Sequence, residues 1–74
     1  MDPTACMQHI EELEHRGQYH DALLAMADLI AWVYGKGGFL PMGFYNDATG
    51  FAIWIDTTFR RIVVRMRFGP QEHR

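Results

Sequence analysis

The chain has 74 residues, of which 49% are hydrophobic and 22% charged, and its formal net charge is −2. This composition excludes disorder along the whole chain, and the length allows a single domain. The only cysteine, Cys6, excludes an intrachain disulfide, and small chains without such a staple commonly gain buried area by self-association. The longest apolar stretch, residues 22–34, is interrupted by Asp28 and is too short to span a bilayer. We expect one domain over residues 1–68, a flexible tail over 69–74, a cytoplasmic location and no membrane association.

A first helix is predicted over residues 3–16. Asp2 is a typical N-cap, and Pro3 fits the first helical position because its missing N–H costs nothing there. Cys6, Ile10 and Leu13 follow at helical spacing and give the helix one apolar side. Gly17 fits the position that ends the helix.

A second helix is predicted over residues 19–34, and residues 35–38, Gly-Lys-Gly-Gly, end it. Apolar side chains cover most of its circumference, and only Asp21, Ala25 and Asp28 define an outer stripe. A helix this apolar must be buried on two sides. One side can meet the rest of the chain, and the other predicts a second subunit or an external partner. The candidates for self-association are Leu29, Trp32 and Val33.

Residues 17–23, with Gly17, Tyr19 and Ala22-Leu23, resemble the turn between the two helices of a tetratricopeptide repeat. The resemblance covers seven residues, or about thirty with the flanking helices. It implies a tight helical hairpin in which Tyr19 and Ala22 pack at the junction.

The second half of the chain predicts a three-stranded antiparallel meander over roughly residues 42–46, 51–57 and 60–68. Residues 46–50 read as a hairpin loop, and residues 57–60 read as a second, weaker turn. Pairing Asp56 with Arg61 places Phe51, Ile53 and Ile55 on one unbroken apolar face. The expected fold is therefore α+β, a helical hairpin packed on a β-meander in the order ααβββ.

The outer face of this sheet is the candidate partner-binding site, formed by Tyr45, Trp54, Arg61, Val63, Arg65 and Arg67. Three interpretations stay open: a solvated face in which arginines cover Trp54, a contact with another protein, or a platform for nucleic acid. The net negative charge argues against nucleic acid. Charge is also uneven, −4 over residues 1–38 and +2 over 39–74, which suits either an anionic partner or attraction between the two halves.

No spacing of histidines or cysteine predicts a metal site, a cofactor or a catalytic centre. His9, His15, His20 and His73 include no pair four residues apart, and Cys6 falls on the apolar side of the first helix. The expectation is a non-catalytic protein–protein interaction module. We expect it to be a homodimeric adaptor, regulator or inhibitor of a larger protein, with nucleic-acid binding through Arg61, Arg65, Arg67 and Trp54 as the alternative.

Overall fold

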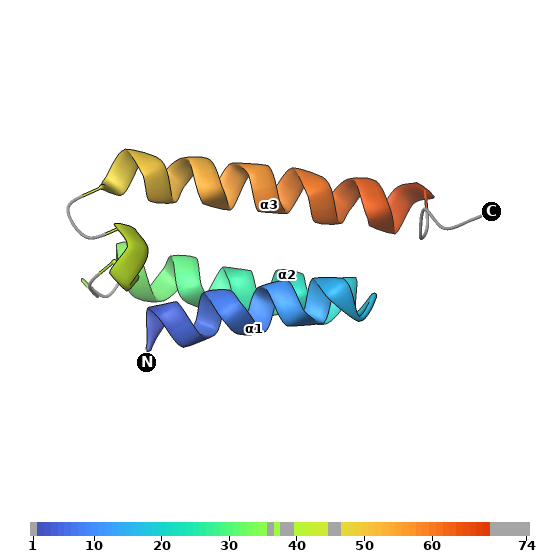
Figure 1. Cartoon of the computed structure of the whole chain (residues 1–74), viewed down its shortest axis with the longest axis horizontal. Coiled ribbons are helices and arrows are strands. Elements are labelled where there is room, and N and C mark those ends of the chain that lie inside the picture. The colour runs from blue at the N-terminus through green and yellow to red at the C-terminus, as the bar shows by residue number, and fades with distance from the viewer. Residues whose placement is uncertain (1, 36, 38–39, 45–46, 69–74) are drawn as a thin grey trace.

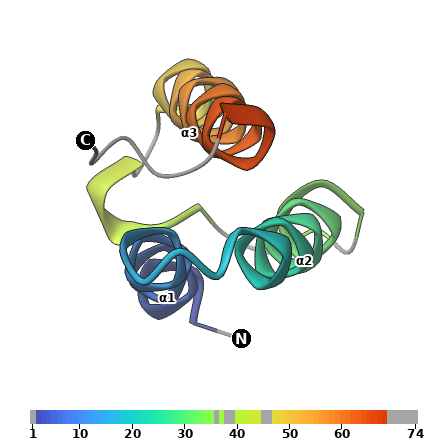
Figure 2. The ribbon, with the colours of Figure 1, turned by 90° about the vertical axis from the view of Figure 1, so that its right-hand side faces the viewer.

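The computed structural model describes residues 2–35, 37, 40–44 and 47–68. Three α-helices account for most of this chain: α1 (Pro3–His15), α2 (Tyr19–Ile30) and α3 (Ala48–Phe68). A π-helical turn, η1 (Ala31–Gly35), continues α2, and a 3₁₀ turn, η2 (Met42–Phe44), precedes α3. Figure 1 shows α3 running along α1 and α2, and Figure 2, seen nearly end-on, shows α1 and α2 side by side beneath it. The predicted tail, residues 69–74, lies outside the described residues.

The first helix begins at Pro3, as the sequence predicts, and ends at His15, one residue before the predicted end. The Asp2 carboxylate accepts hydrogen bonds from the backbone N–H groups of Thr4 (3.0 Å) and Ala5 (3.3 Å), and Pro3 begins the helix. Gly17 follows α1 with φ of +80°, a left-handed conformation that glycine adopts without steric cost. The N-cap, proline and C-terminal glycine predictions are confirmed.

The hairpin of α1 and α2 is also confirmed, together with the packing at its junction. Ala22 is fully buried and Tyr19 is half-buried. The predicted second helix covers α2 and η1, and Gly37 beyond it has φ of +69°. Ala25 does not lie on an outer stripe as expected. It is half-buried, and its carbonyl accepts a hydrogen bond from the Cys6 thiol (3.7 Å).

The predicted meander is wrong, and with it the α+β class. No strand occurs in the described part of the chain, and residues 48–68, expected to form a hairpin loop and two strands, form the single helix α3. The first expected strand, 42–46, corresponds in its described part to η2. The fold is three helices in the order α1, α2, α3.

The sequence of α3 satisfies a helical period as well as a strand period. Phe51, Thr58 and Ile62, spaced seven and four residues apart, are buried on one side of the helix. Asp47, expected in the hairpin loop, instead caps the helix, because its carboxylate accepts the backbone N–H of Gly50 at 2.9 Å. The β-branched residues of the segment disfavour a helix by less than about 0.7 kcal/mol each, which burial of the apolar side outweighs.

The core lies between the three helices. Its fully buried members come from each of them, and they are joined by the aromatic ring of Phe51, which lies near the rings of Phe44 (5.8 Å), Tyr34 (6.0 Å) and Trp54 (6.4 Å). The buried apolar residues are Ile10, Leu13, Ala22, Met26, Leu29, Val33, Phe51 and Ile62. None of the described helices combines the length and apolar character that crossing a membrane requires.

Candidate functional site

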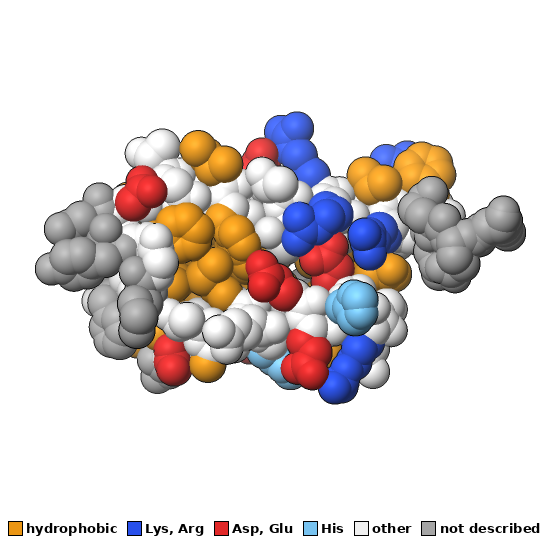
Figure 3. Space-filling view, in the orientation of Figure 1, with side chains coloured by type: hydrophobic (Ala, Val, Ile, Leu, Met, Phe, Trp, Pro, Cys, Tyr) orange, Lys and Arg blue, Asp and Glu red, His pale blue; other side chains and the backbone are white. Residues whose placement is uncertain are grey.

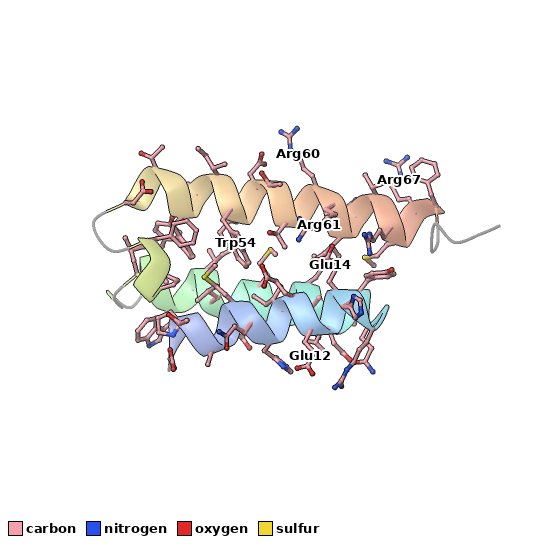
Figure 4. All side chains as sticks on the ribbon, in the orientation of Figure 1. Glu12, Glu14, Trp54, Arg60, Arg61 and Arg67 are labelled. Atoms are coloured by element: carbon pink, nitrogen blue, oxygen red, sulfur yellow. The ribbon has the colours of Figure 1, made fainter. Side chains whose placement is uncertain are left out.

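One buried ion pair joins the two halves of the chain. Glu14 of α1 has a side chain that is only 7% exposed, and Arg61 of α3 reaches it with two nitrogens. Nε and Nη2 of Arg61 donate to the two carboxylate oxygens of Glu14, the latter at 2.8 Å. These hydrogen bonds raise the pKa of Arg61 above its ordinary value, although partial burial opposes the change. Figure 4 shows Arg61 pointing from α3 toward Glu14.

Further charged residues surround this pair on the α1 side of α3. Glu11, Glu14, His15, Arg61 and Arg65 line an open cleft of about 240 Å³ between the two helices, which we call the α1–α3 cleft. Figure 3 faces this side of the molecule and shows acidic and basic side chains next to one another over it. Opposite charges are therefore already matched within the chain, and this contact is the attraction between halves that the charge asymmetry allowed.

The residues predicted for a sheet face do not form one surface. Trp54, Arg61 and Arg65 share the α1 side of α3, where Trp54 is half-buried and stacks on Phe51 with an interplanar angle of 9°. Val63 and Arg67 lie on the opposite side of the helix, as their spacing from Arg61 requires.

The arginine–aromatic platform expected for nucleic acid therefore has no sheet to form on. Arg67 is exposed, with its guanidinium 5.7 Å from the ring of Phe68. Tyr45, the remaining member of the predicted site, lies outside the described residues.

A second surface, with several exposed apolar side chains, lies along α2 and α3. On α2 and η1, His20, Leu24, Ala27 and Ala31 are all exposed, follow one another at spacings of four, three and four, and fall within about 60° around the helix. On α3, Ala52, Phe59, Val63 and Met66 also fall within about 60°, and all but half-buried Val63 are exposed. Together with Tyr34 of η1, these residues form what we call the α2–α3 face.

The α2–α3 face includes four of the seven large apolar side chains that are exposed in the described chain. Leu24 is 55% exposed, Tyr34 57%, Phe59 48% and Met66 44%. At one end of the face, Met66 and residues 17–21 line an open hollow of about 350 Å³. Because Met66 is near residues 17–21 and the ring of Tyr34 is near that of Phe51, α2 and α3 lie side by side and run in opposite directions.

The apolar surplus of the second helix was predicted correctly, but it lies on other residues than those expected. Leu29 and Val33, two of the three self-association candidates, are buried in the core of the single chain, and Trp32 is half-buried. The sequence did contain a signal for the exposed side of α2. His20, Leu24, Ala27 and Ala31 follow one another at coiled-coil spacing, and none of them is an acidic residue, lysine or arginine.

Cys6 lies where its thiol is poorly disposed to react. It is half-buried, and its thiol contacts the carbonyl oxygen of Ala25 at 3.7 Å. Burial raises the pKa of the Cys6 thiol, and the negative charge of Asp28 adds to this effect. No group of three or more histidine, cysteine, aspartate or glutamate side chains within the described residues is placed to hold a metal ion.

Comparisons of the chain with protein-family models, with curated proteins and with solved structures found no match.

Proposed function

We propose that this chain is a non-catalytic protein–protein interaction module, an adaptor, regulator or inhibitor, that binds its partner through the α2–α3 face. The observation that carries the proposal is the exposure of Leu24, Tyr34, Phe59 and Met66 on one surface whose defining residues include no aspartate, glutamate, lysine or arginine. Contiguous apolar surface of this kind marks interaction sites in soluble proteins. The α1–α3 cleft, by contrast, is lined by side chains of opposite charge.

The shape of the face favours a helix as the bound element. Ala27 and Ala31 expose small side chains between Leu24 and Tyr34, so a partner helix can approach the backbone of α2 closely. Phe59 and Met66 then contact its other side from α3. An amphipathic helix recognises such a surface through residues at spacings of three and four.

Burial of the exposed apolar side chains supplies part of the free energy that a complex requires. Burying a large apolar side chain that was half exposed contributes about 1 kcal/mol, so Leu24, Tyr34, Phe59 and Met66 together contribute about 4 kcal/mol before the alanines are counted. Association costs about 4–15 kcal/mol in lost translational and rotational freedom, so a stable complex also requires burial of the rest of the face and its polar contacts.

The state of Cys6 also supports a role without catalysis. Among the described residues it is the strongest nucleophile by side-chain type, and its raised pKa keeps the thiol protonated and weakly reactive at neutral pH.

Site-specific photo-crosslinking tests the proposal. A photoreactive amino acid is placed at Leu24 in the face and, as a matched control, at Ala5, which is exposed on α1. After irradiation of cells that produce the protein, we expect a cross-linked protein adduct from position 24 and none of comparable yield from position 5. Equal yields from both positions, or no adduct from position 24, would overturn the proposal.

A further inference from the structure

We infer that the protein bound at the α2–α3 face is a second copy of this chain, joined by a two-fold axis parallel to the helices. In this arrangement α2 of each copy packs against α3 of the other, and the four helices form a bundle with the two α1 helices outside. The inference rests on the proposed function and adds the identity of the partner and the geometry of its binding.

Two pairs of charged residues border the α2–α3 face with the same spacing. Asp21 and Asp28, seven residues apart, follow the edge of α2 that is remote from α3. Arg60 and Arg67, also seven residues apart, follow the edge of α3 that is remote from α2, and Figure 4 shows both pointing away from α1. One edge is acidic and the other is basic.

Within the described chain these charges are incompletely matched. Neither Asp21 nor Asp28 has an ion-pair partner among the described residues, and Arg67 contacts no described carboxylate. Arg60 pairs with Asp56 at 3.1 Å, but both side chains are more than half exposed, so Arg60 can bridge to a second carboxylate. In a dimer, the aspartates of one copy can therefore pair with the arginines of the other.

The direction of the two-fold axis follows from this pattern. An axis parallel to the helices brings the acidic edge of α2 against the basic edge of the partner's α3. An axis perpendicular to the helices, lying in the contact plane, would instead set α2 against α2 and α3 against α3. Aspartates would then face aspartates and arginines would face arginines, which disfavours assembly. Charge complementarity selects the parallel axis.

The heights of the charges along the bundle agree with this arrangement. Tyr34 lies beside Phe51, and Met66 lies near residues 17–21, so Asp21 is level with Val64 and Asp28 is level with Thr57. Each level lies three residues before an arginine, which is about 4.5 Å along the helix axis. A two-fold axis parallel to the helices keeps these heights unchanged in the partner. Both aspartates therefore come within reach of a guanidinium, Asp21 of Arg67 and Asp28 of Arg60 in the other copy.

The apolar residues fit the same contact. His20, Leu24, Ala27 and Ala31 follow the four–three spacing of a helix seam, and the alanines allow close approach of the partner's α3. Val63 of that helix adds a β-branched side chain between Phe59 and Met66, and Ala52 adds a small one nearer the start of α3. Each copy thus offers complementary surfaces at two equivalent contacts, which closes the dimer and prevents a filament.

Charge reversal tests the inference on the purified full chain. One variant carries Asp21→Lys with Asp28→Lys, and another carries Arg60→Glu with Arg67→Glu. Sedimentation velocity and native mass spectrometry should give twice the 8.6 kDa of one chain for the wild type. Each variant alone should have a dimer dissociation constant at least about tenfold higher than that of the wild type, because like charges then meet at both contacts. An equimolar mixture of the two should recover wild-type affinity within about threefold, since every contact is again between opposite charges.

Two controls keep the result interpretable. Circular dichroism must show that each variant retains wild-type helical content. A third variant with Gln8→Lys and His9→Lys adds positive charge at exposed positions of α1, outside the contact, and should remain dimeric.

Three results would overturn the second-copy inference. These are a monomeric wild type at about 100 μM, variants that dimerise as tightly as the wild type, or a mixture of folded variants that stays monomeric. A monomeric wild type combined with a cross-link from Leu24 to a different protein would leave the proposed function standing. Loss of the cross-link itself would remove both.

Discussion

Replacing Arg61 by methionine tests the ion pair that joins α1 to α3. The change keeps most of the aliphatic stem but leaves the Glu14 carboxylate, only 7% exposed, without its two hydrogen bonds. Breaking a fully buried pair costs about 3–5 kcal/mol. Because the Arg61 side chain is 42% exposed, solvent compensates part of this loss, and we expect about 2 kcal/mol.

An exposed ion pair at the end of α1 supplies a matched control. Arg16 pairs with Glu12 at 2.8 Å, but these side chains are 60% and 55% exposed, so Arg16→Met should cost only about 0.3–0.5 kcal/mol. For a domain of this size, about 2 kcal/mol lowers the melting temperature by roughly 8–16 °C, against about 4 °C or less for the control. Thermal and urea unfolding followed by circular dichroism measure both. Equal losses at Arg16 and Arg61 would refute the assignment of Arg61 to a buried partner.

Three further predictions concern the core, the start of α3 and the thiol. Phe51→Ala should cost about 3–5 kcal/mol, a large part of the roughly 4–11 kcal/mol expected for 74 residues, and urea unfolding at a midpoint near that of the wild type would contradict it. Gly50→Ala should not stabilise the wild type, because the added carbon would lie 2.2 Å from the Asp47 carboxylate. In an Asp47→Ala background the same substitution should stabilise the helix by about 0.5–1 kcal/mol. Equal changes in the free energy of unfolding in both backgrounds would exclude the clash. Cys6 should react with iodoacetamide at pH 8 more slowly in the folded chain than in urea, because burial and Asp28 raise its pKa, and a faster folded-state reaction would contradict this.

The elements that the sequence predicted correctly carry local signals. Asp2 with Pro3, and Gly17 after α1, each depend on hydrogen bonds or backbone geometry within one turn of the helix. Such signals act in the same way whatever the rest of the chain does. For that reason α1 and the hairpin with α2 could be predicted without knowing what packs on them.

The error at α3 came from a segment that fits two periods. Phe51, Ile53 and Ile55 alternate as in a strand, while Phe51, Thr58 and Ile62 follow a helical repeat. Asp47 serves equally well in a hairpin loop and at a helix N-cap. The helix buries Phe51 and Ile62 but leaves Ile53 60% exposed. The strand register places Phe51, Ile53 and Ile55 together on one apolar face, so it gives no sign that Ile53 would remain exposed.

The candidate site could be predicted in kind but not in position. The sequence alone shows that the second helix has more apolar residues than one core can bury. Which of them remain exposed depends on where α3 lies, because α3 and α1 together bury Leu29 and Val33 and leave Leu24 and Tyr34 exposed.

The same misassignment also changed the meaning of the arginines. Under the meander, Arg61 would pair with Asp56 and leave Arg65 and Arg67 as a basic platform beside Trp54. On a helix, residues three and four apart are neighbours, so Asp56 pairs with Arg60 and frees Arg61 to reach Glu14. The helical period thus places the arginines of residues 60–67 on two sides of α3. Arg61 lies on the side that contacts α1, and Arg60 and Arg67 lie on the side that we propose contacts a second chain.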